Sequence, residues 1–442
     1  GLPLLATGGV AYATPADRPV ADVFTCLRLH TTLDAAGRRL SANAQRHIHS
    51  PTAMAERFAD LPAAVEETTR LEARLEFTLR DLGYRFPDFP TPPGKTMEEL
   101  LREVTFDGAR ARHGAVPPVL AAQLERELAL IARLGFCGYF LIVWDICRHA
   151  REQGILVQGR GSAANSAACH ALGITAVDPL RNRLLFERFL SEGRVGRDGR
   201  PSWPDIDLDL PSGEPRERII QKVYADHAPR GAAMTANFIT YRGRGAMRDS
   251  GLALGLDEDQ IDDIAKNMWR FSARTFRNAL GTKPELAALA QSVESDRQMN
   301  LLVDITERLD RLPRHISMHP CGVILGDATL LNLTPVETSG MGLPMSQFDK
   351  DDMDPMGFLK LDVLGVRMQS AMAYAVRELE RVKGEKLELD EIPRDDAETF
   401  KQIRTTNTLG IFQIESPGQR ELTGKHQPTE FNDLTIQISL FR

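Results

Sequence analysis

The sequence predicts an α/β fold of the α+β kind, in which a helical segment interrupts a strand-forming region. Period-two alternation in PDIDLDL (204–210) is typical of a strand. Shorter apolar runs predict further strands at 155–157, 322–325 and 358–364. Apolar residues at helix-like spacing predict helices over 53–79, 117–153, 255–308 and from about 367. A chain of 442 residues, at ~150 residues per domain, suggests about three domains.

Composition excludes several classes of protein. The chain carries 54 basic and 61 acidic residues, a net charge of −7, which argues against a globally basic nucleic-acid coat but not against a locally basic groove. No apolar run reaches the ~18 residues of a membrane span, and the apolar start has no basic flank, so we expect a cytoplasmic protein without a signal peptide. The five cysteines include no C-x-x-C pair, which predicts free thiols. The first residue is Gly1, so a fragment is expected.

Proline marks the clearest boundary in the chain. Residues 83–95 hold four prolines between aromatic residues and are predicted to be a linker. Thr96 and Glu99 then have the spacing of a capping box that opens a helix.

The strongest motif is the acidic strand itself. Alternation places Asp205, Asp207 and Asp209 on one face of the strand, with the apolar residues on the other. Neighbouring carboxylates on a rigid strand can hold two Mg²⁺ ions ~4 Å apart. A solvated edge strand is an equal alternative on this motif alone. An EF-hand is excluded, because Leu210 stands where the calcium loop requires glycine.

Two weaker motifs have simple structural alternatives. Gly159-Arg160-Gly161-Ser162, between a predicted strand and an Ala-rich helix, can hold phosphate on backbone N–H groups or can be a plain turn. In FLKLDVL (358–364), Lys360 and Asp362 share a strand face, which suits a metal-bound triphosphate or a simple cross-strand ion pair.

Basic residues gather in two places. Arg244 and Arg248 lie close together, and Arg270, Arg274 and Arg277 have the spacing of one helical stripe, of the kind that follows phosphate backbones. Acidic residues at 257–263 lie between the groups, so solvated helix faces are the alternative. Four histidines, at 47, 49, 315 and 319, lack a supporting ligand pattern and are interpreted as structural or surface residues.

Taken in order, these motifs resemble the bacterial C-family DNA polymerases, the alpha subunits of DNA polymerase III. The matching blocks cover nearly the whole chain: GFCGYFLIVWDI (135–146), QGRGSAANSAA (158–168), DPLRNRLLFERFL (178–190), PDIDLDL (204–210), ITYRGRGAMRDSG (239–251), MHPCGVIL (318–325), SQFDKDDMD (346–354), LKLDVLG (359–365) and IFQIES (411–416). The stretches at 31–48 and 345–364 are most similar to the error-prone accessory branch, which is associated with damage-tolerant synthesis.

The resemblance implies a polymerase-beta-like nucleotidyltransferase palm. The implied order is the last part of a PHP domain (1–80), palm (81–236), a helical thumb (237–308), palm again (309–367) and the start of the fingers (368–442). Position by position, Asp205, Asp207 and Asp362 match the metal-binding aspartates, and Asp209 matches a flanking acidic position that is not a ligand. Arg160, Gly161, Ser162 and Lys360 match positions beside the triphosphate, and Arg244 and Arg248 match basic positions near nucleic acid.

The implied activity is that of a DNA-directed DNA polymerase using two Mg²⁺ ions, primer-template DNA and deoxynucleoside triphosphates, in error-prone repair synthesis. A sliding clamp and damage-tolerance proteins are implied partners of a full-length family member only. Gly9 and Ala11 replace the usual metal-binding residues of the PHP domain, which argues against a metal site there. Most of the fingers are not in the chain, which leaves a non-catalytic DNA-binding fragment as an alternative. A nucleotide-sugar transferase with a DxD strand is a third reading, which leaves Lys360 and the arginines unexplained.

Overall fold

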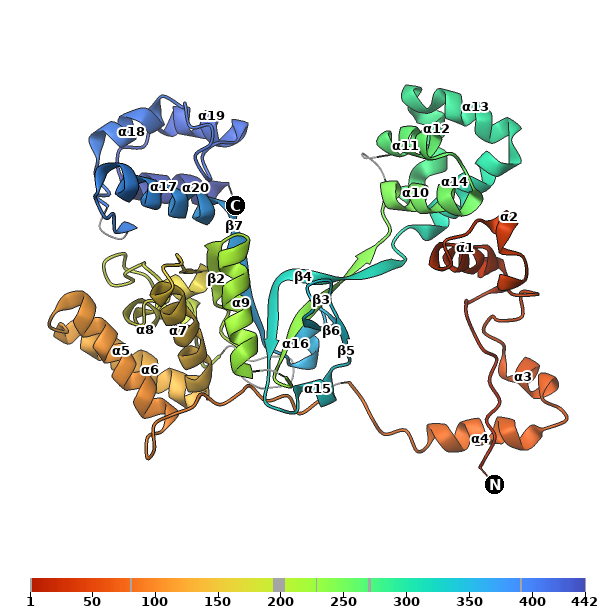
Figure 1. Cartoon of the computed structure of the whole chain (residues 1–442), viewed down its shortest axis with the longest axis horizontal. Helices are drawn as coiled ribbons and strands as arrows, with labels where there is room; N and C mark the ends of the chain where they lie inside the picture. The colour runs from red at the N-terminus through yellow and green to blue at the C-terminus, as the bar shows by residue number, and fades with distance from the viewer. Residues whose placement is uncertain are drawn as a thin grey trace. The chain divides into compact units, whose positions relative to one another are not determined.

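The computed structural model describes residues 2–79, 82–193, 203–227, 229–268, 272–389 and 392–441. Its contacts divide the chain into two compact units, Gly1–Asp81 with Ala236–Ser317, and Leu82–Thr235 with Met318–Arg442 (Figure 1). Each unit therefore joins segments that are distant in the sequence.

The first unit is mainly helical in its described residues. Its helices are α1 (Arg18–Arg28), α2 (Leu33–Ala36), α3 (Pro51–Arg57), α4 (Pro62–Glu72), α10 (Gly243–Leu254), α11 (Glu258–Lys266), α12 (Phe276–Thr282), α13 (Ala287–Ser295) and α14 (Arg297–Leu309). Its two segments share a core in which Val23 and Cys26 of α1 pack with Ala253 and Ile305. The apolar face of α1 thus needs the distant helices α10 and α14 for its burial.

The predicted helix at 53–79 is divided into two. Ser50 caps α3, and Pro62 begins α4, where a proline costs no hydrogen bond because the first N–H groups of a helix have no partner inside it. The helix ends at Glu72, and Leu75 and Leu79 are exposed. The apolar residues after Glu72 continue the helical spacing, but none of the described segments buries them, and the helix is not continued there.

The second unit contains most of a mixed sheet. Within the described residues its seven strands lie in the order β1 (Gln158–Arg160), β2 (Asp207–Pro211), β7 (Lys360–Val366), β4 (Pro313–Leu325), β3 (Ala232–Thr240), β6 (Pro344–Asp349) and β5 (Val336–Thr338). β2 and β7 are parallel, whereas β1 is antiparallel to β2, and β4 is antiparallel to β7. The apolar run at 155–157 is not a strand. β1 begins one residue later and contains Gly159 and Arg160.

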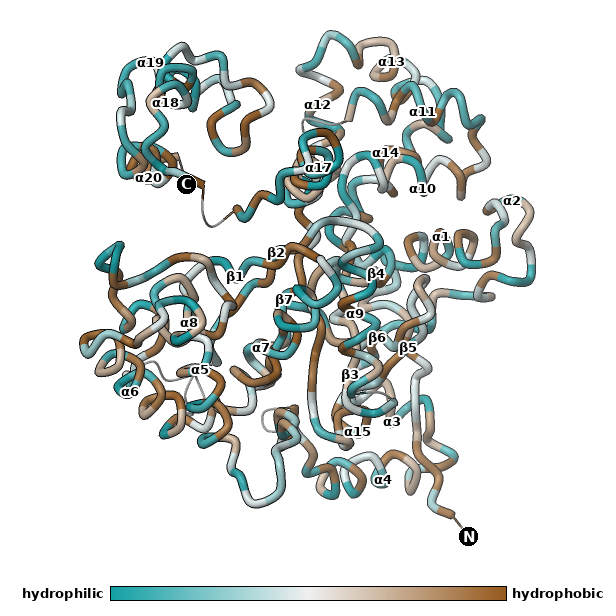
Figure 2. The backbone as a smooth tube through the Cα atoms, turned by 60° about the vertical axis from the view of Figure 1, so that its left-hand side comes forward, coloured by the Kyte–Doolittle hydropathy of each residue, from teal (hydrophilic) through white to brown (hydrophobic). Residues whose placement is uncertain are grey.

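Helices form much of the rest of the second unit. They are α5 (Met97–His113), α6 (Pro118–Arg133), α7 (Cys137–Glu152), α8 (Ala167–Ala171), α9 (Glu214–His227), α15 (Leu330–Leu333), α16 (Met353–Met356), α17 (Arg367–Lys383), α18 (Ala397–Arg404), α19 (Pro417–His426) and α20 (Phe431–Leu440). Two of them, α9 and α17, pack against β2 and β7. The predicted capping box of Thr96 and Glu99 is confirmed at the start of α5. The first half of α7 is buried. Figure 2 colours each residue by its hydropathy and shows α7 beside β7.

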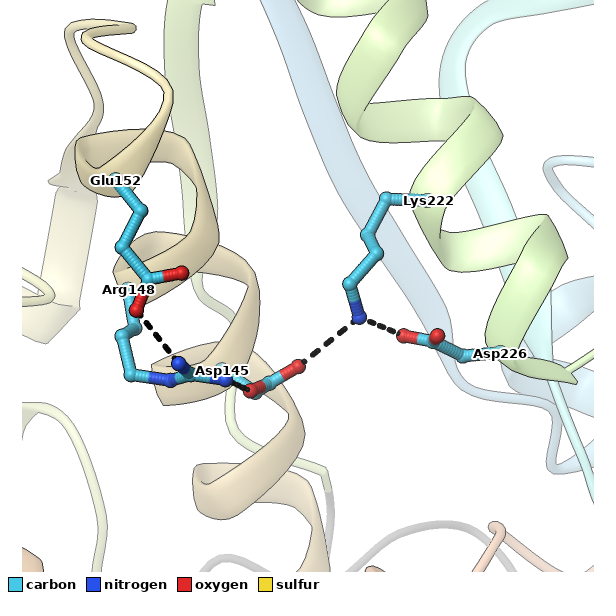
Figure 3. Close-up of polar contacts among 5 residues, drawn as sticks. All are labelled: Asp145, Arg148, Glu152, Lys222 and Asp226. Carbon is cyan, nitrogen blue, oxygen red and sulfur yellow. Dashed lines mark hydrogen bonds and ion pairs between the residues drawn. The ribbon is translucent and has the colours of Figure 1, made fainter.

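Two features fix these helices and the proline-rich segment in place. Lys222 of α9 contacts both Asp226 and Asp145, and Asp145 also pairs with Arg148 of α7, so a chain of charges joins the two helices (Figure 3). The residues predicted as a linker, 83–95, form no helix or strand but are anchored. The ring of Tyr84 packs on Phe358, with 5.0 Å between centroids.

The Ala-rich helix after the glycine turn is shorter than its composition suggests. A single 3₁₀ segment, Gly161–Asn165, follows β1, and α8 then has only five residues. In the described residues no single helix is long and apolar enough to cross a membrane. α6 and α7 pass that test only as a pair bent by 117°.

Candidate active site

Three carboxylates from two distant segments meet at the centre of the second unit. Asp207 is the first residue of β2 and is paired in register with Asp362 of β7, and Asp205 lies just before β2. One oxygen of each carboxylate lies within 4.8 Å of the others. The three residues that the resemblance assigns as metal ligands thus lie together. Their proximity follows from the parallel pairing, which puts equivalent positions of β2 and β7 on the same face of the sheet.

Asp209 has a different environment from the other three aspartates. It is buried, 8% exposed, and both its oxygens accept hydrogen bonds from Nε of Arg160, at 3.0 and 3.2 Å. Arg160 also contacts Asp207, with 3.2 Å between Nη2 and Oδ2. Asp209 is thus the partner of a cation, and its oxygens are not among the converging ligand atoms.

Positive charge compensates the carboxylates only in part. Lys360 forms an ion pair with Asp362, two residues along the same face of β7. Burial, followed by the negative charge of Asp205, raises the pKa of Asp207 above its usual value despite Arg160. The site therefore keeps unbalanced negative charge, which a cation can neutralise.

The residues fit a divalent metal ion. Oδ1 of Asp362 is buried and has no hydrogen-bond partner, which is costly for a carboxylate oxygen unless something binds to it. Three carboxylates are hard oxygen ligands of the type that Mg²⁺, Mn²⁺ and Ca²⁺ prefer. Among the described residues, Asp205, Asp207 and Asp362 are the group with ligand atoms close enough to share an ion.

The glycine turn faces these carboxylates. Gly161 has a φ of +76°, and a Cβ built at this position would lie 4.0 Å from Oδ2 of Asp207. The hydroxyl of Ser162 donates to the backbone carbonyl of Asp205 at 3.4 Å. Glycine is needed here because of the positive φ, and its missing side chain leaves the approach to Asp207 open.

Gly322 is a site residue that the sequence analysis missed. It pairs in register with Asp362, and a Cβ there would lie 2.9 Å from Cδ of Lys360 and 2.8 Å from Oγ1 of Thr235. A glycine inside a strand is a known signal of close approach, so the position could have been noticed. Its absent side chain gives Lys360 the room to reach Asp362.

The predicted DNA-contacting arginines belong to the first unit. Arg248 pairs with Asp262 at 2.6 Å, and Nε of Arg244 donates to the carbonyl of Ala265 at 3.5 Å. The single helical stripe is wrong. Arg274 lies in a 3₁₀ turn (Ala273–Thr275) and Arg277 in α12, so their spacing is not that of one α-helix.

These arginines are also close to acidic residues. Arg274 lies 4.0 Å from Asp310, and Arg277 lies 3.9 Å from Glu307. Arg270 lies outside the described residues. The side chains of Arg274 and Arg277 are 70% and 48% exposed, so both remain accessible to a polyanion.

Nearby atoms hold three of the histidines noted in the sequence, namely His47, His49 and His319. His47 and His49 stack with 4.1 Å between ring centroids, and each has a ring nitrogen 2.9 Å from a backbone carbonyl. Nδ1 of His319 accepts hydrogen bonds from the backbone N–H groups of Cys321 and Gly322. His319 therefore fixes the backbone of β4 just before Gly322, which pairs with Asp362.

Comparison with known proteins gives two family matches. Residues 99–365 match the family described as the bacterial DNA polymerase III alpha NTPase domain, and residues 368–442 match the finger domain of the same subunit.

Curated relatives agree with these matches. The chain is 40% identical to an error-prone DNA polymerase of Brucella suis, over all of the chain and 41% of the relative. It is 41% identical to one of Aromatoleum aromaticum (100% and 40%) and 40% identical to one of Bradyrhizobium diazoefficiens (99% and 37%). The chain thus spans about two fifths of the length of these relatives.

Proposed function

The chain belongs to the family of bacterial DNA polymerase III alpha subunits, and we propose that it holds the catalytic carboxylates of a DNA-directed DNA polymerase. The observation that carries the proposal is the pairing of Asp207 with Asp362, together with the unpartnered buried oxygen of Asp362. The names of the relatives favour the error-prone branch, and hence synthesis on damaged templates. The family also favours polymerase chemistry over a nucleotide-sugar transferase.

In this proposal Asp205, Asp207 and Asp362 hold two Mg²⁺ ions. When bound, such ions lower the pKa of the primer 3′-hydroxyl and neutralise charge on the leaving pyrophosphate. The reaction is attack of that hydroxyl on the α-phosphate of a deoxynucleoside triphosphate, with loss of pyrophosphate.

The remaining site residues orient the substrate. Lys360 and Arg160, which lie beside the carboxylates, supply positive charge to the phosphates, and the turn of Gly161 and Ser162 offers backbone N–H groups. The sheet around Asp205, Asp207 and Asp362 corresponds to the palm, helices α10–α14 to the thumb, and residues 368–442 to the start of the fingers. Arg244, Arg248, Arg274 and Arg277 are proposed to contact the DNA backbone, as is Arg270.

The experiment compares matched aspartate variants. Mn²⁺ binding by the chain, measured by electron paramagnetic resonance, should be lost in Asp207→Asn and Asp362→Asn and retained in Asp209→Asn. In a full-length protein carrying the same substitutions, extension of a labelled primer by one nucleotide should likewise be lost in Asp207→Asn and Asp362→Asn and retained in Asp209→Asn. Equal loss in Asp209→Asn would show that the register of the metal strand has been misassigned.

A further inference from the structure

A second buried carboxylate lies in this unit, outside the group of three aspartates. Glu127, in the middle of α6, has 0% of its surface exposed. It accepts hydrogen bonds from the hydroxyl of Ser166 (2.8 Å), the backbone N–H groups of Ala167 and Ala168 (3.0 Å each) and Nε2 of Gln123 (2.7 Å). Burial raises the pKa of Glu127, and these hydrogen bonds oppose the rise. A buried charge persists in a protein only with such complete pairing.

These hydrogen bonds hold the start of α8. The first N–H groups of a helix lack partners inside it, and a helix of five residues has little stability of its own. Glu127 takes the N–H groups of Ala167 and Ala168, and the Ser166 hydroxyl accepts the next one, from Cys169, at 3.0 Å. The start of α8 is therefore attached to α6 through one side chain.

The glycine turn ends at the same point. Residues 161–165 run directly into Ser166, whose backbone N–H donates to the carbonyl of Ala163. Within the turn, Nδ2 of Asn165 donates to the carbonyl of Ser162 at 2.9 Å. Hydrogen bonds within the turn, the peptide bond from Asn165 to Ser166 and the hydrogen bond of Ser166 to Glu127 thus connect Ser162, beside Asp205, with Glu127.

The other end of the turn is fixed by the sheet. Arg160, the last residue of β1, pairs in register with Asp207. The turn is consequently held at its first end by β2 and at its second end by Glu127. Loosening either end would move Gly161 and Ser162 relative to the carboxylates.

We propose that Glu127 is a positioning residue of the nucleotide site, which fixes the turn of Gly161 and Ser162 so that it can receive the triphosphate. The inference rests on the proposed function. A carboxylate is required because all four neighbours donate to it. A glutamine has only one acceptor oxygen, and its amide N–H groups would face the N–H group of Ala167 or Ala168. A helix cap alone does not require a buried charge, since Ser166 already caps Cys169.

The test compares Glu127→Gln with Glu125→Gln, a matched control on the exposed face of the same helix, where Glu125 is 48% exposed. Hydrogen exchange over residues 158–172 should become faster only in Glu127→Gln. The affinity for deoxyadenosine triphosphate with Mg²⁺, measured by titration calorimetry, should fall by up to about tenfold, because the loss of one buried hydrogen bond to a charged group lowers the population of chains in which the turn is correctly placed. Binding of Mn²⁺ alone should be unchanged, which separates misplacement of the turn from collapse of the site.

Ser166→Ala provides a second route if Glu127→Gln does not fold. It removes one donor to Glu127 and the cap of Cys169, and the affinity for the triphosphate should fall in the same direction. Unchanged affinity in the folded variants, or unchanged exchange of the turn in Glu127→Gln, overturns this inference alone. Absence of triphosphate binding by the unsubstituted chain overturns the proposed function, and the inference with it.

Discussion

Replacing Asp207 by asparagine tests whether the site is built for cations, because the change removes one charge and keeps the shape. The ligand oxygens of the three carboxylates lie within 4.8 Å of one another. At an effective dielectric constant of about 20, each pair at that separation repels by about 3.5 kcal/mol. The attraction between Arg160 and Asp207, at 3.2 Å, is about 5 kcal/mol by the same calculation. These three contributions leave a repulsion of about 2 kcal/mol on Asp207, which Lys360 and the solvent around the exposed Asp205 reduce further.

We therefore expect Asp207→Asn to stabilise the metal-free chain by about 1 kcal/mol, which for a domain of this size raises Tm by about 2–4 °C. Mg²⁺ should raise the Tm of the unsubstituted chain, because a ligand that binds only the folded state stabilises it. The variant should lose this increase. The assay is thermal unfolding by scanning calorimetry, with a chelator and with millimolar Mg²⁺.

Asp209→Asn is a control for which we expect a change of Tm in the opposite direction. Asp209 holds Arg160 and lies outside the converging ligands, so its replacement should lower Tm and leave the effect of Mg²⁺ intact. A lower Tm for Asp207→Asn in chelator would refute the repulsion argument. A full Mg²⁺ effect in Asp207→Asn would refute its role as a ligand.

Three further substitutions test the packing and the ion pairs of the fold. A Cβ at Gly108 would lie 2.0 Å from the last carbonyl oxygen of α8. In Gly108→Ala, the cost of overpacking, about 2–3 kcal/mol, exceeds the gain in helix propensity, ~1 kcal/mol. The free energy of unfolding, measured in urea, should therefore fall by about 1–2 kcal/mol. Gly281→Ala, with open space around it, should raise that energy by up to ~1 kcal/mol. Although burial opposes it, the hydrogen bond from Arg148 and the charge of Lys222 hold the pKa of Asp145 below its usual value. The stability that Asp145 adds is therefore present above about pH 4 and is lost as the pH falls through the pKa of Asp145 in the folded chain. The difference in unfolding free energy between the unsubstituted chain and Asp145→Asn should shrink in acid. A difference that does not change with pH would contradict the lowered pKa of Asp145.

The face of each acidic residue could be predicted from sequence, but its partners could not. Strict alternation fixes the side of the strand to which Asp207 and Asp209 point, and likewise Lys360 and Asp362. It does not say which strands are neighbours, or that Arg160 would hold Asp209. That information depends on the register of strands about 50 residues apart (β1 and β2) and about 150 residues apart (β2 and β7), which is set by the packing of the whole unit.

The arginine stripe shows how a periodic pattern can mislead. Spacing by 4 and 3 residues indicates one helix face only if the helix is continuous, and a 3₁₀ turn precedes α12. Glu127 shows the reverse case. It lies on the stripe of Leu124, Leu128 and Ile131, where a charge is out of place, so the pattern contained a signal. What the pattern could not supply was the partner, because the donors of α8 are about 40 residues away.

In the proposed site, the aspartates of the acidic strand have two roles: Asp205 and Asp207 are to bind cations, and Asp209 holds Arg160. The contacts explain why both roles are needed. A site with several close carboxylates must remain folded before any cation binds, so positive side chains must lie nearby. If Arg160 were held by Asp207 alone, a cation that bound to Asp207 would take away the main partner of Arg160. Asp209 holds Nε of Arg160 with both oxygens, at 3.0 and 3.2 Å, whereas Asp207 has a single contact with Nη2 of Arg160, at 3.2 Å. In the proposed site, Arg160 can therefore stay in place while the oxygens of Asp207 take a cation, and Asp209 would stabilise the site without being a ligand.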